Sequence, residues 1–285
     1  MRPFFFILII GLVAVSSCDE LPIEVILETS KSTETAVEVM SEVISTFDVV
    51  EDFVSGSELF LTQFDCLLPE DAEVRILDDD FEDGDGVEVL IDFGVIGSEP
   101  CGLLCKDNKY RAGKICITLD RPYAEPNAKL SVYFGEANPF YSGNGKKMSK
   151  IEGEFNLTRV GADELLFQCD GLQVTTVEND ALVLQGDLSI VCIENSGFGL
   201  INDKLTFEGE LTVESGDNEL IFEIVEPLHK EYGLSCVQYI KTGKLEVDPM
   251  NSASNISVDF DPNNDASCDN TIGITVNGRT FIYMY

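Results

Sequence analysis

The chain has 285 residues, with 18 Lys and Arg against 52 Asp and Glu, so its formal net charge at pH 7 is −34. This charge excludes nucleic acid as a partner, because binding a phosphate backbone requires cationic side chains. The length suits one large domain or two smaller ones, and so acidic a surface favours solubility and attracts cations.

Residues 1–17 have the organisation of a signal peptide. Arg2 precedes an apolar run from Phe4 to Val15, and small residues then lead to Cys18. The apolar run is about a dozen residues long, whereas about 20 are needed to span a bilayer, so we do not expect a transmembrane anchor. The four residues that end in Cys18 resemble the lipobox of bacterial lipoproteins, in which the cysteine thiol receives a diacylglycerol. The resemblance implies lipidation at Cys18 and attachment to a lipid membrane; an ordinary secretory signal is the alternative.

Asp19 and Glu20 follow the cysteine directly. They resemble the acidic sorting stretch of some Bacteroidetes lipoproteins, which implies location at the outer membrane or the cell surface. The alternatives are the inner membrane and the periplasmic leaflet. Residues 18–31 are interpreted as a tether between the lipid and the folded domain.

Residues 32–56 are predicted to form an amphipathic helix. Apolar residues recur at a spacing of three and four between Ala36 and Val54, with acids between them, and Gly56 ends the pattern. Val39 and Val49 fall outside this stripe, so the apolar face is broad. We expect the helix to cap a sheet, and a partner-binding helix is the alternative.

From Leu59 onward the hydrophobic pattern has a period of two, in short runs separated by turn residues. Many strands at close spacing predict a mainly β fold of antiparallel sheets, as a sandwich or an open barrel, over residues 57–285. Asn277-Gly278 supplies the positive φ angles of a tight hairpin turn, so the chain should end in a strand.

Two stretches of the β region look alike. Each has a strand that ends in Asp-Phe, at Phe93 and Phe260, then a loop that carries Cys101 or Cys268, and then a returning strand. An internal repeat of this kind would divide the region into two related halves, about 57–160 and 161–285.

Several short motifs follow one another through the β region. They are Arg111-Ala-Gly-Lys-Ile, Arg121-Pro-Tyr, Ile151-Glu-Gly, Val225-Glu-Pro-Leu, Thr242-Gly-Lys-Leu-Glu-Val and Cys268-Asp-Asn. In this order they resemble uncharacterised lipoproteins of Flavobacteria and related Bacteroidetes, over roughly Val89 to Tyr285. Asp261 and Pro262 depart from that pattern, since a glycine is expected after Asp-Phe. The resemblance supports the fold and the anchor and implies no chemistry.

Eight cysteines follow Cys18, and an even number in an exported chain favours disulfides. Cys236 is expected to pair with Cys268, and Cys169 with Cys192 is a second expected pair. Zinc is the alternative, but the chain has a single histidine, His229, which we expect at the surface.

No cofactor is expected, with calcium as the alternative. Asp259, Asp261, Asn263 and Asp265 have the alternate spacing of oxygen ligands in a calcium loop, although the central glycine and a bidentate glutamate are missing. A denser acidic run extends from Asp78 to Asp85. If calcium binds, we expect it in the later loop, because alternate residues can turn their oxygens toward one centre.

The sequence offers little support for an enzyme. A serine or cysteine nucleophile needs a base, usually a histidine, and the sequence offers only His229 and no Gly-x-Ser-x-Gly motif. We therefore expect a lipid-anchored lipoprotein whose β domain serves binding or structure, with an envelope protein or a polysaccharide as the partner. The alternative is a hydrolase of extracellular polysaccharide or peptide that uses a carboxylate pair.

Overall fold

The structure is a computed structural model. It describes residues 22–56, 67–135, 139–195, 199–200, 202–216, 218–233, 236–250 and 252–285. Within these residues the fold is mainly β, with one long helix and one large antiparallel sheet, and the predicted fold class is confirmed. The signal segment and Cys18 lie outside the described residues.

Sixteen strands make up the described part of the sheet. They are β1 (Glu73–Asp78), β2 (Val87–Asp92), β3 (Leu103–Leu104), β4 (Tyr110–Ala112), β5 (Lys114–Leu119), β6 (Lys129–Phe134), β7 (Phe140–Gly143), β8 (Met148–Arg159), β9 (Glu164–Thr175), β10 (Ala181–Glu194), β11 (Lys204–Ser215), β12 (Asn218–Glu231), β13 (Thr242–Pro249), β14 (Ile256–Asp259), β15 (Thr271–Val276) and β16 (Arg279–Met284). The main path runs β1-β2-β5-β6-β8-β9-β10-β11-β12-β13-β14-β15-β16, and the short strands β3, β4 and β7 branch from β8.

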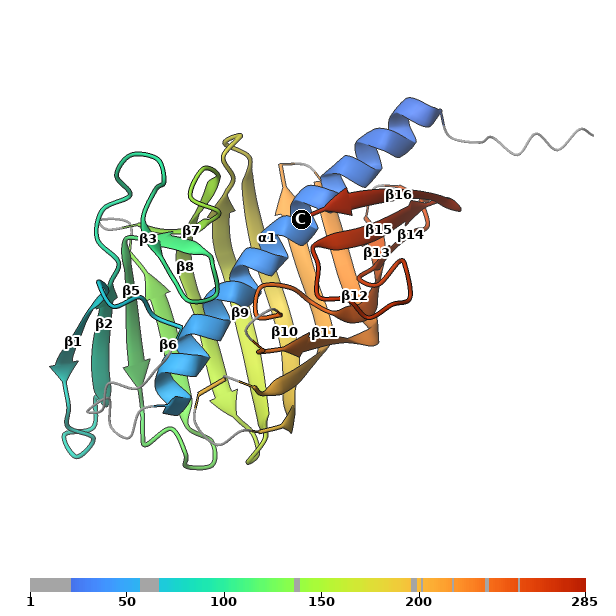
Figure 1. Ribbon diagram of the computed structural model, residues 1–285. Coiled ribbons are helices and arrows are strands. Elements are labelled where there is room, and N and C mark those ends of the chain that lie inside the picture. The colour runs from blue at the N-terminus through green and yellow to red at the C-terminus, as the bar shows by residue number, and fades with distance from the viewer. Residues whose placement is uncertain are drawn as a thin grey trace, which may run out of the picture.

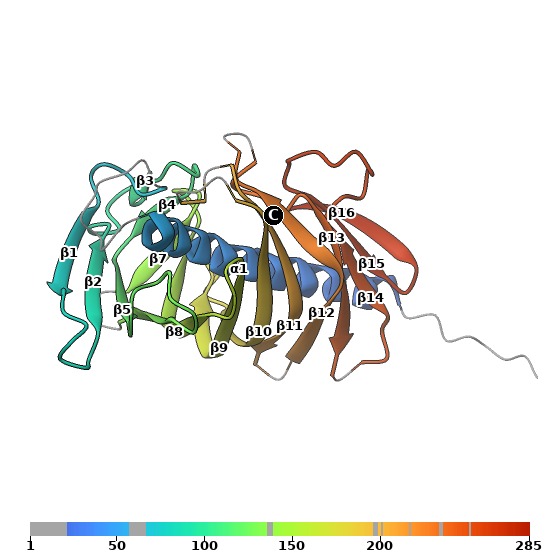
Figure 2. The same cartoon turned by 90° about the horizontal axis from the view of Figure 1, so that it is seen from below.

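The sheet curves around the helix α1 (Ile23–Gly56), which lies along its concave side and crosses most of the strands (Figure 1). The view from below shows the strands curving around much of the helix (Figure 2). The sheet is not closed, because β1 and β16 form its two edges. The result is an open, curved sheet with α1 lying along its concave side.

The helix begins at Ile23, nine residues earlier than the sequence predicts. Residues 23–31 of the predicted tether over residues 18–31 are therefore helical. The carbonyl of Pro22 accepts the first hydrogen bonds, from the N–H groups of Val25 and Ile26. Ser30 is buried and its hydroxyl lies 2.7 Å from that of Tyr283 on β16. Packing against a strand about 250 residues away stabilises this end of the helix, and the local pattern carried no sign of it.

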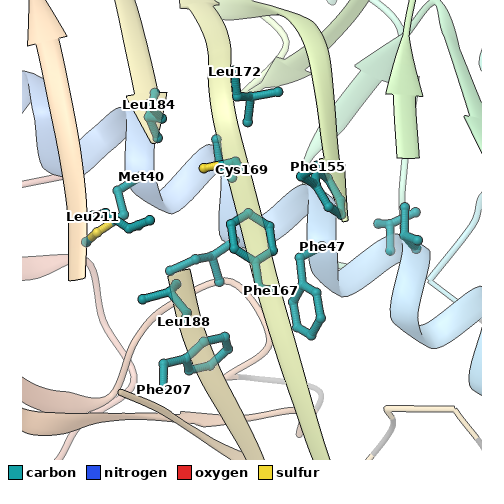
Figure 3. Close-up of a cluster of buried hydrophobic side chains, with 14 of the residues drawn as sticks. Met40, Phe47, Phe155, Phe167, Cys169, Leu172, Leu184, Leu188, Phe207 and Leu211 are labelled. Atoms are coloured by element: carbon teal, nitrogen blue, oxygen red, sulfur yellow. The ribbon is translucent and has the colours of Figure 1, made fainter. Parts of the chain in front are cut away.

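The hydrophobic core lies between α1 and the inward-facing residues of the strands. Figure 3 shows Phe155, Phe167 and Phe207 from β8, β9 and β11 gathered around Met40 and Phe47 of the helix. The ring centroids of Phe155 and Phe167 are 5.0 Å apart, and those of Phe47 and Phe207 are 6.0 Å apart. Alternate residues of each strand face this core, which explains the period of two in the sequence.

The helix does more than cap a sheet, because it is buried on every side from Val43 to Val54. The backbone N–H groups of Leu67 and Leu200 donate to Asp52, and Arg111 of β4 binds Ser45, so loops and a short branch strand also contact α1. The expectation of a one-sided amphipathic helix is therefore corrected: α1 is the centre of the domain.

The two similar stretches form equivalent strand pairs. β2 pairs with β5 at one end of the sheet, and β14 pairs with β15 at the other. The boundary expected between two halves, near residue 160, falls in the hairpin that joins β8 to β9, and those two strands remain paired up to Arg159 and Leu165. The halves are thus parts of one continuous sheet.

Candidate functional site

The buried length of α1 carries a row of polar side chains among its apolar ones. Ser45, Asp48, Glu51 and Asp52 are each less than a tenth exposed. Because an unpaired buried charge is costly, each must find a partner in the surrounding strands and loops. An amphipathic helix, as predicted for residues 32–56, would leave such acids on its polar face, so their burial departs from that prediction.

Asp48 is paired with Lys230 and Tyr232. The Lys230 ammonium lies 3.0 Å from one carboxylate oxygen, and the Tyr232 hydroxyl donates a hydrogen bond of 2.5 Å to the other. Burial raises the pKa of Asp48, and both partners oppose this shift. Lys230 and Tyr232 come from β12 and the residue that follows it, so this cluster connects the middle of the helix to the sheet.

Arg111 forms a second buried cluster. Its side chain is fully enclosed, and its Nη2 atom donates to the carbonyl and hydroxyl oxygens of Ser45, at 3.0 and 2.7 Å. The same guanidinium binds both carboxylate oxygens of Asp107, at 2.8 and 2.6 Å. Burial opposes ionisation of Asp107, but Arg111 outweighs it and holds the pKa of that carboxyl below its ordinary value.

Asp52 holds two loops against the last turns of the helix. Its two carboxylate oxygens accept backbone N–H groups of Leu67 and Leu200, at 2.5 and 2.6 Å. Burial raises its pKa to about 6, although both hydrogen bonds favour the ionised form. These contacts place the two loops beside the C-terminal end of α1.

Glu51 contacts Tyr123 and Arg159. It accepts a short hydrogen bond from the Tyr123 hydroxyl, and its other oxygen lies 3.8 Å from Arg159 Nη2. Arg159 is oriented by two further contacts, a 2.7 Å bond from Nη1 to the Ala162 carbonyl and a position 4.5 Å above the Tyr123 ring. Burial raises the pKa of Glu51 to about 7 and outweighs the opposing effects of Tyr123 and Arg159.

A cavity of about 580 Å³ lies beside this cluster, at the C-terminal end of α1. Strand ends from the middle of the sheet form its walls, and loops form its rim. The lining residues are Glu51, Val54, Ser55, Gly56, Phe81, Leu119, Pro122, Tyr123, Ala124, Arg159, Ala162, Asp163, Leu165, Ile190, Cys192, Asn195, Gly199, Leu200, Asp203 and Leu205. Its volume is in the range of small-molecule sites, and apolar walls with a few convergent polar groups are typical of them.

The cavity favours binding over covalent chemistry. Cys192 lines it, but burial raises the pKa of this thiol to about 11, so the nucleophilic thiolate is scarce near neutral pH. His229 lies on β12 and is not among the residues that line the cavity. Glu51, Asp163 and Asp203 line the cavity, and a hydrolase with a carboxylate pair at this site would have to use two of them.

The structure joins Cys236 and Cys268 by a disulfide with 5.1 Å between the Cα atoms, as the sequence predicts. The second predicted pair is wrong, because Cys169 and Cys192 are not bonded. Cys169 faces Gly186 across the β9–β10 ladder, whereas Cys192 lies beyond the end of that pairing. Cys192 therefore lies six positions along β10 from the residue opposite Cys169, too far for a disulfide.

The structure arranges the carboxylates of the two acidic stretches differently. In the later loop, both carboxylate oxygens of Asp261 accept backbone N–H groups, from Asp265 and Ala266, and Asp259 accepts the N–H of Asp261. These hydrogen bonds occupy the carboxylate oxygens and stabilise the turn. In the earlier run, Asp78, Asp83 and Asp85 each place one carboxylate oxygen within 4.8 Å of the other two.

Comparison with known protein families, with curated proteins and with solved structures finds no match. Within the described part of the chain, no helix has the length and apolar character needed to cross a membrane. The function is therefore argued from the cavity and the residues around it.

Proposed function

We propose that this protein is a lipid-anchored surface lipoprotein whose β domain binds a small organic molecule in the cavity at the end of α1. The anchor is Cys18, and the cavity is the observation that carries the binding role. Its floor is made of apolar strand ends, and its polar wall is the cluster of Glu51, Tyr123 and Arg159. An apolar body and one polar group of a ligand would both find complementary surroundings there.

The position of the cavity along the helix suits a surface protein. Cys18 precedes the first helical residue, Ile23, by five residues, so the lipid lies close to the N-terminal end of α1. The cavity lies at the other end of this 34-residue helix, about 50 Å away at 1.5 Å per residue. An anchored molecule would thus present the cavity far from the end of the helix that is tied to the membrane.

The cavity can be tested with a fluorescent reporter, because the chain contains no tryptophan. Phe81→Trp places a single indole in the lining. With the acylated protein in nanodiscs of phosphatidylcholine, we expect 4-nitrobenzyl alcohol, a neutral quencher with an apolar body, to quench this indole saturably.

A matched pair of variants controls the measurement. Ala124 is exposed at the rim, so Ala124→Phe should block entry and abolish saturable quenching, whereas Ala181→Phe, at the opposite end of β10, should leave it unchanged. Quenching that is linear in concentration, or equal in both variants, would contradict a binding cavity.

The anchor needs its own experiment. Cells that express Cys18→Ser should incorporate no labelled fatty acid into the protein, and protease treatment of intact cells should digest the wild-type domain. Equal labelling of both proteins would contradict the anchor, and full protection from protease would contradict the surface location.

A further inference from the structure

The guanidinium of Arg159 lies at the wall of the cavity and has hydrogen-bond donors that the protein does not use. Its Nη1 atom donates to the Ala162 carbonyl at 2.7 Å, and its Nη2 atom lies 3.8 Å from the Glu51 carboxylate, which is longer than a hydrogen bond. Its Nε atom is buried and has no hydrogen-bond partner among the described residues. Because buried donors in native proteins nearly always have a partner, an unpaired one requires an explanation.

The unused donors share one edge of the guanidinium. The group is planar, and its Nε–H and one N–H of Nη2 point in the same direction, so together they form a fork. The three residues that contact the guanidinium, Glu51, Tyr123 and Ala162, line the same cavity as Arg159. The guanidinium therefore lies at the boundary of the cavity, where an acceptor atom of a ligand would supply the missing partner.

The protein holds this guanidinium in place without a ligand. The Ala162 carbonyl fixes Nη1, and the guanidinium carbon lies 4.5 Å from the centre of the Tyr123 ring. The Arg159 side chain is only 16% exposed, so it is packed along most of its length. Donors that are already oriented lose little freedom when a ligand binds, which favours affinity.

The charges around the fork favour an uncharged acceptor. A carboxylate would match the fork in shape, but it would meet the Glu51 carboxylate near Nη2 and the repulsion of a chain with a net charge of −34. An organic cation would be repelled by Arg159 and could not accept a hydrogen bond from it. A carbonyl oxygen avoids both penalties, and its two lone pairs suit the two N–H groups of the fork.

We infer that the cavity binds an uncharged carbonyl compound, a ketone, ester or amide, whose oxygen accepts hydrogen bonds from Nε and Nη2 of Arg159. This inference rests on the proposed binding function and adds the chemical class of the ligand. The apolar part of the compound fills the space against strand residues of the lining, among them Leu119, Leu165 and Ile190.

The experiment compares three quenchers that share a 4-nitrophenyl body. They are the ketone 4-nitroacetophenone, the hydrocarbon analogue 1-ethyl-4-nitrobenzene, in which a methylene replaces the carbonyl, and the anion 4-nitrobenzoate. With the acylated Phe81→Trp protein in the same nanodiscs, we expect the ketone to quench saturably and to bind more tightly than the benzoate. Ala124→Phe should abolish saturable quenching, which separates the cavity from quencher dissolved in the lipid.

Variants of Arg159 separate its hydrogen bonds from the rest of the cavity. Arg159→Met should weaken binding of the ketone about tenfold, because a hydrogen bond from a charged donor supplies this much. It should leave binding of the hydrocarbon nearly unchanged, and that titration shows whether the cavity is intact. Arg121→Met, at an exposed arginine outside the lining, should affect neither compound. Arg159→Lys keeps the charge without the planar fork, so it should restore only part of the ketone affinity, and it gives the same comparison if the methionine variant does not fold.

The outcomes distinguish the inference from the function on which it rests. If Arg159→Met weakens the ketone no more than the hydrocarbon, the cavity is a binding site and the role of the fork is refuted. If the benzoate binds more tightly than the ketone, the cavity takes an anion and the uncharged class is wrong. If Arg121→Met weakens the ketone as much as Arg159→Met does, the effect is one of general charge and the inference is overturned. If none of the three compounds quenches saturably, the binding function falls and the inference falls with it.

Discussion

Replacing Glu51 by glutamine tests the buried helix cluster. Burial raises the pKa of this carboxyl to about 7 from an ordinary value of 4.5. A carboxyl whose pKa is raised by folding stabilises the folded state fully below pH 4.5, and this contribution is lost as the pH rises through 7. At about 1.4 kcal/mol for each pH unit, the wild-type protein loses about 3 kcal/mol of folding free energy over this range.

Glu51→Gln keeps the shape of the side chain and an oxygen that accepts from Tyr123, but it cannot ionise. We therefore expect the variant to be about as stable as the wild type at pH 4.5 and about 3 kcal/mol more stable at pH 8. Asp52, whose charge contributes to the raised pKa of Glu51, titrates in both proteins, so the difference reports the loss of the Glu51 charge together with its effect on Asp52.

The assay is urea denaturation of both proteins at intervals between pH 4.5 and 8.5, followed by circular dichroism. Glu208→Gln, an exposed position on β11, is the matched control and should follow the wild type at every pH. A difference between Glu51→Gln and the wild type that is constant with pH would refute the reasoning, because it would show that Glu51 has the same pKa in both states.

Three further predictions concern stability. Changing Cys236 and Cys268 to serine should lower the free energy of unfolding by about 3 to 4 kcal/mol, since the bridge closes a loop across a separation of 32 residues, and a reductant should then affect the wild type alone in thermal melts. Arg111→Met should lower it by about 3 to 5 kcal/mol because Asp107 remains buried, whereas Arg75→Met, at the exposed edge strand, should change it by less than about 1 kcal/mol in urea titrations. Asp261→Ala should lower the melting temperature equally with and without millimolar calcium, because the Asp261 carboxylate accepts backbone N–H groups. A decrease in melting temperature seen only with calcium would indicate a calcium site in this loop.

The strands were predictable because the residues of each strand alternate between apolar and polar according to the side of the sheet that they face. Alternation between core and solvent is a local pattern, and it identified the strand runs and the C-terminal hairpin at Asn277-Gly278. The Cys236–Cys268 bridge was predictable for a related reason, since both residues flank strands that are close in the chain. Cys169 and Cys192 also flank strands that are close in the chain, but the register of β9 and β10 separates them. That register depends on bulges that the sequence did not reveal.

The central position of α1 was not predictable from its own pattern. Glu51 and Asp52 read as members of a polar face, because their partners Tyr123, Arg159 and Leu200 come from elements at least 70 residues away. One signal was present: the apolar residues from Phe47 to Val54 surround these acids on all sides of the helix, which leaves no continuous polar face. Acids in such a segment are better interpreted as buried and paired than as solvated.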